Sequence, residues 1–410
     1  MIDQTTYRPI EGRSTEYLTL VGWLGLMVLA ALGSAYYMEH NGHWVTGMSN
    51  QVIWGTPHVF AVFLIVAASG ALNVASIASV FGKKAYKPLS RLSALLAVAL
   101  LAGGLAVLVL DLGRPDRLIV AMTTYNFKSI FAWNIYLYTG FFVIVAVYLW
   151  MMMERRMQKY SSTAGLVAFV WRLILTTGTG SIFGFLVARQ AYDAAILAPT
   201  FIVLSFAYGL AIFLLVIMTV CRGTGICLGD ALLVRLRNLL RLFVVSSLYF
   251  VAVYHLTNLY GTENHGVEKF LLVSGGIYTG LFWVGQVIVG YLVPMGLLYH
   301  PATRGSRTNI VLASVLVIVG GLCQMYVTII AGQAFPLNMF PGYDVSSSFF
   351  DGVVAAYSPS LPEVVLGLGG MALAMAIVAV AIKVLPFLPD DLSDKKAGDG
   401  EDADAEVLGA

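Results

Sequence analysis

Charged residues are scarce in this sequence. Only 11% of its 410 residues are Asp, Glu, Lys or Arg, whereas 59% are hydrophobic, and the mean hydropathy is +0.83. A soluble domain carries about 25% charged residues, so this protein could not cover itself with polar surface in water. Because the formal net charge is only +2, bulk charge gives no reason to expect nucleic-acid binding.

Cysteine is also scarce. Cys221, Cys227 and Cys323 include no Cys-x-x-Cys pair, and we interpret them as small apolar packing residues. Three thiols cannot supply the four thiolates of an all-cysteine iron–sulfur cluster. The first apolar run is long enough to span a bilayer and no small-residue cleavage site follows it, so we expect no cleavable signal peptide.

Long hydrophobic runs, in contrast, fill most of the sequence. A spanning helix needs about 20 mostly apolar residues. Ten runs have this character: 16–38, 53–80, 90–112, 129–153, 164–190, 194–221, 236–260, 268–299, 309–334 and 361–388. We therefore predict an all-α integral membrane protein with about ten transmembrane helices in residues 1–388. The acidic segment 389–410 has no apolar face and is predicted to be a disordered cytoplasmic tail.

The positions of the basic residues predict the orientation in the membrane. Eighteen of the 24 Lys and Arg residues lie in the terminal segments and the even-numbered loops, and five lie in the odd-numbered loops. The positive-inside rule then places both termini in the cytoplasm. The remaining residue, Arg172, lies inside the fifth run, and we expect it to reach the cytoplasmic interface with its long side chain.

The predicted outer face collects polar and aromatic side chains. Five of the six histidines are assigned to it, namely His40, His43, His58, His255 and His265. The last outer loop, 335–360, has no Lys or Arg but six Phe or Tyr residues. Such a loop is either covered by a partner or lies in the lipid interface, and the sequence leaves both open.

The densest polar cluster ends the third predicted helix. Its sequence DLGRPDR, residues 111–117, has two acids and two arginines around a Gly-x-Pro break. Arginine on the outer side runs against the charge trend. The cluster is either an ion-paired cap between helices or a polar lid over a site in the outer leaflet, and Asp111, Arg114 and Asp116 are its candidate site residues.

Further candidates lie at the outer ends of other helices. His58 follows WGTP at a helix start, where proline favours the first turn. Arg189 and Tyr192 lie at the outer end of the fifth run. His255 and Asn258 are three residues apart in the seventh run, so they share a helix face. A carbonyl ligand that takes up protons needs such hydrogen-bond donors and a proton source. No metal site is predicted.

The sequence also resembles a known family. DLGRPDR, then YNFKS at 125–129 and FAW at 131–133, is similar to the signature of the NrfD/PsrC/HybB family. The resemblance covers about residues 53–335, with one extra helix at each end. The ten-helix form and the WGTPH segment most resemble the DsrP branch. The family implies a central core of eight helices arranged as two four-helix bundles.

The resemblance also implies a function. Family members are quinone-interacting membrane subunits of redox complexes in the bacterial inner membrane. They imply non-covalently bound quinone or menaquinone, and a periplasmic ferredoxin-like partner with four iron–sulfur clusters. The DsrP branch adds a cytochrome c, a cytochrome b and a further iron–sulfur partner from sulfur metabolism.

The family motif supports some of the candidate residues more than others. Asp111 and Arg114 match the motif itself, and His58 and Tyr192 match positions near the quinone of the family. His255 and Asn258, in contrast, are candidates because of their position alone.

Two other functions compete with a quinone-dependent oxidoreductase subunit. A haem-bearing cytochrome b needs paired histidines within the membrane, and only His58 and His255 lie at a suitable depth. A secondary transporter needs broken helices in matching halves, whereas only TTGTGS at 176–181 looks loosened. We therefore expect a subunit with no haem or iron–sulfur cluster of its own, which oxidises quinol or reduces quinone only within a complex.

Overall fold

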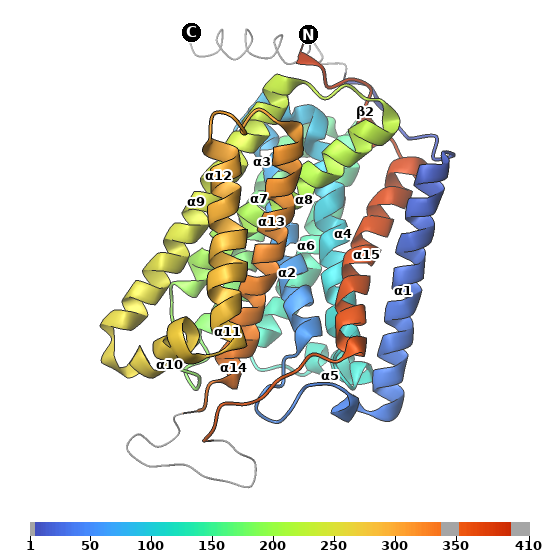
Figure 1. The fold of residues 1–410 in the computed structure, drawn as a ribbon. Helices are drawn as coiled ribbons and strands as arrows, with labels where there is room; N and C mark the ends of the chain where they lie inside the picture. Colours follow the sequence, from blue (N-terminus) through green and yellow to red (C-terminus); the bar gives the residue numbers. More distant parts are fainter. Residues whose placement is uncertain (1–4, 338–351, 395–410) are drawn as a thin grey trace.

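The computed structural model describes residues 5–337 and 352–394, and this part of the protein is mostly helical (Figure 1). Ten of its helical spans are long and apolar enough to cross a membrane. The prediction of an all-α integral membrane protein with about ten transmembrane helices is confirmed. The division of the central eight helices into two four-helix bundles stays a prediction.

The spans are built from long helices, three of them interrupted. They are α1 (Thr15–Asn41), α2 (Thr56–Ala71) with α3 (Asn73–Ser79), α4 (Ser90–Leu110), α6 (Ile130–Met153), α7 (Ser161–Gly184), α8 (Leu197–Thr224), α9 (Asp230–Tyr260), α11 (Ile277–Gly280) with η7 (Leu281–Leu292) and α12 (Val293–Tyr299), α13 (Arg307–Tyr326) with η8 (Val327–Ala331) and α14 (Gly332–Ala334), and α15 (Leu361–Val384).

Short elements connect these spans. They are the helices α5 (Leu118–Thr123) and α10 (His265–Lys269), the segment η6 (Phe270–Ser274), the strands β1 (Tyr7–Arg8) and β2 (Leu388–Pro389), and the 3-10 turns η1 (His43–Val45), η2 (Lys84–Leu89), η3 (Pro115–Arg117), η4 (Gln158–Tyr160) and η5 (Thr262–Asn264). The segments η6, η7 and η8 are π-helical.

Helix α2 lies at the centre of the molecule and packs against α4, α7, α8, α13 and α15. It crosses α8 at close range, and both helices carry glycine there. A Cβ atom on Gly70 would lie 1.6 Å from the carbonyl oxygen of Ser205, and one on Gly209 would lie 2.1 Å from the amide nitrogen of Ala71. Small residues allow such close approach between membrane helices, so these two glycines set the distance between α2 and α8.

The two ends of the described residues meet on one side of the helices. Strand β1 pairs antiparallel with β2, and Asp394 accepts hydrogen bonds from the first amides of α9. An even number of spans places the two ends of the chain on the same side, as is found here. The expectation of disorder from residue 389 was therefore wrong for 389–394, and residues 395–410 lie outside the described residues. We call the opposite end of the helices, where α2 begins and α4 ends, the distal end (Figure 1).

The eighth predicted run, 268–299, is not one helix. Residues 265–274 form α10 and η6 as a short separate piece at the distal end, and the span itself begins at Ile277. The break falls at Gly276, whose φ of +60° suits glycine best. Hydropathy alone missed this break because the residues on both sides of it are apolar.

Arg172 does not reach the membrane interface as expected. It occupies the middle of α7, and only 2% of its surface is exposed. One guanidinium nitrogen donates to the carbonyl oxygen of Ser69 at 3.1 Å, and the group lies over the rings of Phe169 and Phe206. Ser69 lies three residues before Leu72, where α2 ends and the chain turns into α3.

Most of the outer loop 335–360 cannot be compared with its prediction, because residues 338–351 lie outside the described residues. Of its described aromatic residues, Phe335 packs against Phe270 at a ring distance of 5.5 Å, and Tyr357 is buried. Docking of a partner on this loop therefore stays a prediction.

Candidate functional site

The candidate residues lie at the distal half of the molecule, but in separate places. Asp111 is in a group of acids at the end of α4. His58 and Tyr192 belong to an aromatic stack at the start of α2. His255 and Asn258 form a polar cluster between α9 and α10.

Asp111 ends α4 and turns its carboxyl group inward. Its Oδ1 atom is buried and has no hydrogen-bond partner within the described residues. Burial, and then the nearby carboxylates of Glu363 and Glu39, raise the pKa of Asp111 to about 8. A carboxyl group with such a pKa can bind and release protons near neutral pH.

Gly113 brings the same turn close to His43. With φ at +66°, Gly113 adopts a backbone conformation that other residues avoid, and a Cβ atom there would lie 3.4 Å from the His43 ring. The His43 Nε2 atom is buried, lies 3.6 Å from Glu39, and makes no hydrogen bond in the described part of the protein. Two side-chain atoms near the distal end of α4, Asp111 Oδ1 and His43 Nε2, are thus buried without a hydrogen-bond partner among the described residues.

Arg114 and Asp116 lie apart from this buried group. They pair with each other through two hydrogen bonds of 3.0 Å, and their side chains are 64% and 61% exposed. The pair raises the pKa of Arg114 and lowers the pKa of Asp116. The ion pair predicted in DLGRPDR is therefore present, but it joins two residues of the same turn at the surface and not two helices.

The start of α2 is fixed by a buried network from α15. Tyr357 donates to Glu363 Oε1 at 2.6 Å, and the Thr56 amide donates to the Tyr357 hydroxyl at 2.7 Å. Glu363 also accepts from the amides of Gly47 and Ser360. Glu363 is fully buried, so the network holds the first turn of α2 beside His58 in one position.

His58 stacks on Trp54. The two ring centroids are 5.1 Å apart and the planes differ by 8°. Trp54 in turn stacks on Tyr192 at 6.4 Å and 26°. The imidazole of His58 is half-buried and makes no side-chain hydrogen bond within the described residues. Its nitrogens are therefore available to a ligand.

Tyr192 does not offer its hydroxyl group in the same way. The hydroxyl donates to the carbonyl oxygen of Ile329 at 2.7 Å, and burial raises its pKa. A phenol has one proton to donate, so the expected hydrogen bond from Tyr192 to a quinone is not available in this arrangement. The ring, rather than the hydroxyl, is what Tyr192 presents to Trp54.

Arg189 and Gln333 hold the loop before α2. Arg189 donates to the backbone oxygens of Gln333 and Gln51, both at 2.8 Å. Gln333 accepts from the amides of Ile53 and Trp54 and donates to the Trp54 carbonyl, each at 3.0 Å. Arg189 was expected to bind a ligand, but these donors bind the backbone. Sequence reasoning missed Gln333, because nothing distinguishes it from other amides near helix ends.

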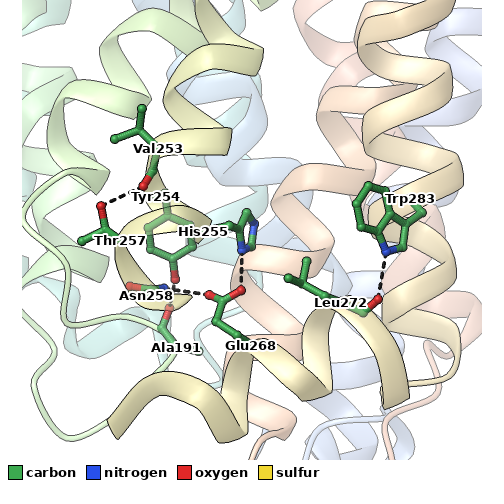
Figure 2. Close-up of polar contacts among 9 residues, drawn as sticks. All are labelled: Ala191, Val253, Tyr254, His255, Thr257, Asn258, Glu268, Leu272 and Trp283. Atoms are coloured by element: carbon green, nitrogen blue, oxygen red, sulfur yellow. Dashed lines mark hydrogen bonds and ion pairs between the residues drawn. The ribbon is translucent and has the colours of Figure 1, made fainter. Parts of the chain in front are cut away.

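His255 and Asn258 meet a residue that the sequence did not single out, Glu268 on α10 (Figure 2). His255 Nδ1 lies 2.8 Å from Glu268 Oε2, and Asn258 Nδ2 donates to Glu268 Oε1 at 2.9 Å. Glu268 is fully buried. The prediction that His255 and Asn258 share a face identified two members of this cluster. The third member, Glu268, was not identified, because residues 268–299 were predicted to form one helix.

A pocket opens beside this cluster. It lies between α8, α9, η7 and the distal half of α13 with η8, and His255 lines it. Asn258 and Glu268 do not line it. Glu268 lies against His255 Nδ1 and orients the imidazole ring, and Asn258 donates to Glu268 (Figure 2).

Comparison with known proteins agrees with the resemblance. Residues 44–337 match the family described as polysulphide reductase, NrfD. The sequence is 30% identical to an Hdr-like menaquinol oxidoreductase integral membrane subunit of Archaeoglobus fulgidus, over 94% of this protein and 97% of the relative. It is 23% identical to a selenate reductase subunit of Mesobacillus selenatarsenatis, over 90% and 93%.

A third relative is a polysulfide reductase chain of Wolinella succinogenes, 24% identical over 70% of this protein and 96% of the relative. The resemblance expected from DLGRPDR and its neighbouring motifs is thereby confirmed at the level of the family. The DsrP branch stays a prediction. The chain belongs to the polysulphide reductase NrfD family.

Proposed function

We propose that the protein is the quinone-binding membrane subunit of a redox complex, which exchanges electrons between membrane quinones and a periplasmic iron–sulfur subunit. Its relatives bear the names of a menaquinol oxidoreductase membrane subunit and of parts of selenate and polysulfide reductases. The distal end is then the outer side of a bacterial inner membrane, as the positive-inside rule predicts.

The observation that carries the proposal is the free imidazole of His58, stacked on Trp54 at a rigid helix start. A bound quinone takes up two electrons and two protons on reduction, and quinol releases them on oxidation. His58 supplies a hydrogen bond to a ring oxygen, and the stacked aromatic rings give a planar head group an apolar surface. Both features suit a neutral aromatic ligand.

Asp111 is the proposed proton-exchanging group of this site. Its pKa of about 8 lies near neutrality, where a group can both accept and donate protons. It is electrostatically coupled to Glu363, which is hydrogen-bonded through Tyr357 to Thr56 at the start of α2. Arg114 and Asp116, on the surface, are free to contact a partner subunit rather than the head group.

The test is His58→Ala in the purified complex. We expect weaker binding of a short-tail naphthoquinone and lower quinol oxidation or quinone reduction, with the complex still assembled. The matched control is His40→Ala, since His40 is an exposed histidine at the end of α1. If His58→Ala leaves both turnover and naphthoquinone affinity at the level of His40→Ala, the quinone does not bind at this site.

A further inference from the structure

The pocket beside His255 contains polar groups that nothing in the described part of the protein satisfies. Gln286 projects into it from η7 and is only 3% exposed. Its side-chain amide makes no hydrogen bond within the described residues. With no protein partner, this amide is available to a molecule in the pocket that can accept and donate hydrogen bonds.

Gln324 adds a second available donor. Its Oε1 atom accepts from the Tyr208 hydroxyl at 2.9 Å and also from the Tyr291 hydroxyl. These two bonds fix the carbonyl end of the side chain. The Nε2 end makes no hydrogen bond in the described part of the protein, and Gln324 lines the pocket. Thr328, one turn further along, also lines it with a hydroxyl that has no partner among the described residues.

His255 adds an imidazole ring to these groups. The Glu268 carboxylate accepts from Asn258 with one oxygen and faces His255 Nδ1 with the other. Because Glu268 lies against Nδ1, the other ring nitrogen, Nε2, is the one left for a ligand. The pocket thus offers an imidazole on α9 together with amide and hydroxyl groups on η7, α13 and η8.

The backbone around the pocket is unusual. Each of the three π-helical segments contributes a lining residue: Leu271 from η6, Gln286 from η7 and Thr328 from η8. π-helical turns are rare and are often found at functional sites. In η7 the π-helical geometry extends over 12 residues. The pocket is therefore where the helical geometry of the protein is most altered.

The lining residues also indicate the chemistry of the ligand. They include no Lys, Arg, Asp or Glu among the described residues, so the pocket does not favour an ion. Leu197 and Phe201 supply apolar walls, and the polar groups are amide, hydroxyl and imidazole. An apolar pocket with a few convergent neutral polar groups suits a neutral ring that carries oxygen atoms.

We propose that this pocket is a second binding site for a quinone or quinol head group, separate from the one at His58. The inference rests on the proposed function for the class of ligand. Tyr192 stands between the two sites. Its ring stacks on Trp54, and it also packs against Gly332, which lines the pocket.

The experiment measures how many naphthoquinone molecules the purified full-length protein binds. The protein is freed of native quinone in detergent and titrated with a radiolabelled short-tail naphthoquinone by equilibrium dialysis. Wild type is expected to bind two equivalents. Gln286→Leu is expected to weaken one equivalent at least tenfold and leave the other, whereas His58→Ala weakens the equivalent that Gln286→Leu leaves.

Two further variants keep the result interpretable. Thr328→Val preserves side-chain shape and should weaken the same equivalent as Gln286→Leu, even if the latter folds poorly. Thr177→Val is the matched control on the exposed face of α7 and should retain two equivalents.

One equivalent in wild type, lost in His58→Ala, overturns the second site while the proposed function stands. Two equivalents at wild-type affinity in both Gln286→Leu and Thr328→Val also overturn it, since the pocket then holds water only. No binding in wild type overturns the proposed function together with the second site.

Discussion

Tyr192 occupies the space that a side chain at Gly332 would fill. A Cβ atom on Gly332 would lie 2.4 Å from Cε1 of Tyr192. The ring is almost fully buried, and its hydroxyl is bonded to Ile329 in η8. The residue cannot move aside at low cost, so Gly332 and Tyr192 together define the wall between the His58 stack and the His255 pocket.

Gly332→Ala should therefore destabilise the protein. The added methyl group must displace the Tyr192 ring or α14, and overpacking of this kind costs about 1–3 kcal/mol. Denaturant unfolding in detergent should show lower stability than wild type, and the fluorescence of Trp54, which stacks on Tyr192, should shift.

Gly296→Ala in α12 is the matched control, because no atom lies within 4 Å of a Cβ placed there. Alanine favours a helix by about 1 kcal/mol over glycine, so this variant should be as stable as wild type or more so. Equal stability of the Gly332 and Gly296 variants would show that Tyr192 is not held in place.

Tyr192→Phe should affect stability rather than ligand binding. The variant loses the hydrogen bond to the Ile329 carbonyl, but that oxygen keeps its bond from Gln333 Nε2 at 2.9 Å. A net loss of about 0.5–1.5 kcal/mol is expected, with naphthoquinone affinity unchanged. A tenfold loss of affinity at wild-type stability would mean that the hydroxyl leaves Ile329 to bind the ligand.

The ten spans could be predicted from the sequence because each carries enough apolar residues to satisfy a bilayer by itself. The breaks within the spans could not be predicted from the sequence. The turn at Leu72, the separate η6 segment and the π-helical η7 depend on tertiary contacts, and their residues are as apolar as those of the regular helices. The depth of Arg172 was misjudged for the same reason, since its partners Ser69 and Phe206 lie on other helices.

The candidate site was predicted only in part. Residue type and position at helix ends identified His58, Asp111 and His255. Nothing in the sequence indicates that Arg189 and Tyr192 donate to backbone carbonyls, because those acceptors are more than a hundred residues away along the sequence.

The polar residues of the His255 pocket were also beyond prediction. Gln286 and Gln324 lie inside hydrophobic runs, where the usual role of a buried amide is to join neighbouring helices. Tyr208 and Tyr291, which bond to Gln324 Oε1, lie on other spans. Only the fold reveals which atoms of these amides lack partners among the described residues.

Arg114→Ala should be tolerated by the isolated protein. The side chain and its partner Asp116 are both exposed, and exposed ion pairs contribute little to stability. We expect wild-type unfolding in detergent and wild-type naphthoquinone binding. Loss of the partner subunit on purification, without loss of stability, would assign Arg114 to the docking surface. A clear drop in stability would contradict the surface position of the pair.

Asp111→Asn should remove a pH dependence of stability. The pKa of Asp111 is raised to about 8 in the folded protein, mainly by burial. Between its ordinary value and pH 8 the folded state therefore binds a proton that the unfolded state releases. Stability then falls as pH rises through this range, by up to about 1.4 kcal/mol per pH unit. Asparagine stays neutral, so the variant should lose this slope and exceed wild type in stability above pH 8.

The comparison requires a carboxylate that does not titrate in the same range. Asp116 meets this requirement, because its exposed pairing with Arg114 lowers its pKa and it stays ionised in both states from about pH 5 to 8. Asp116→Asn should therefore keep the wild-type slope of stability against pH, measured by reversible unfolding in mixed micelles. All three proteins contain the same histidines. A wild-type slope in Asp111→Asn would mean that water or a partner keeps the Asp111 carboxylate ionised, and would remove it from the proposed proton exchange.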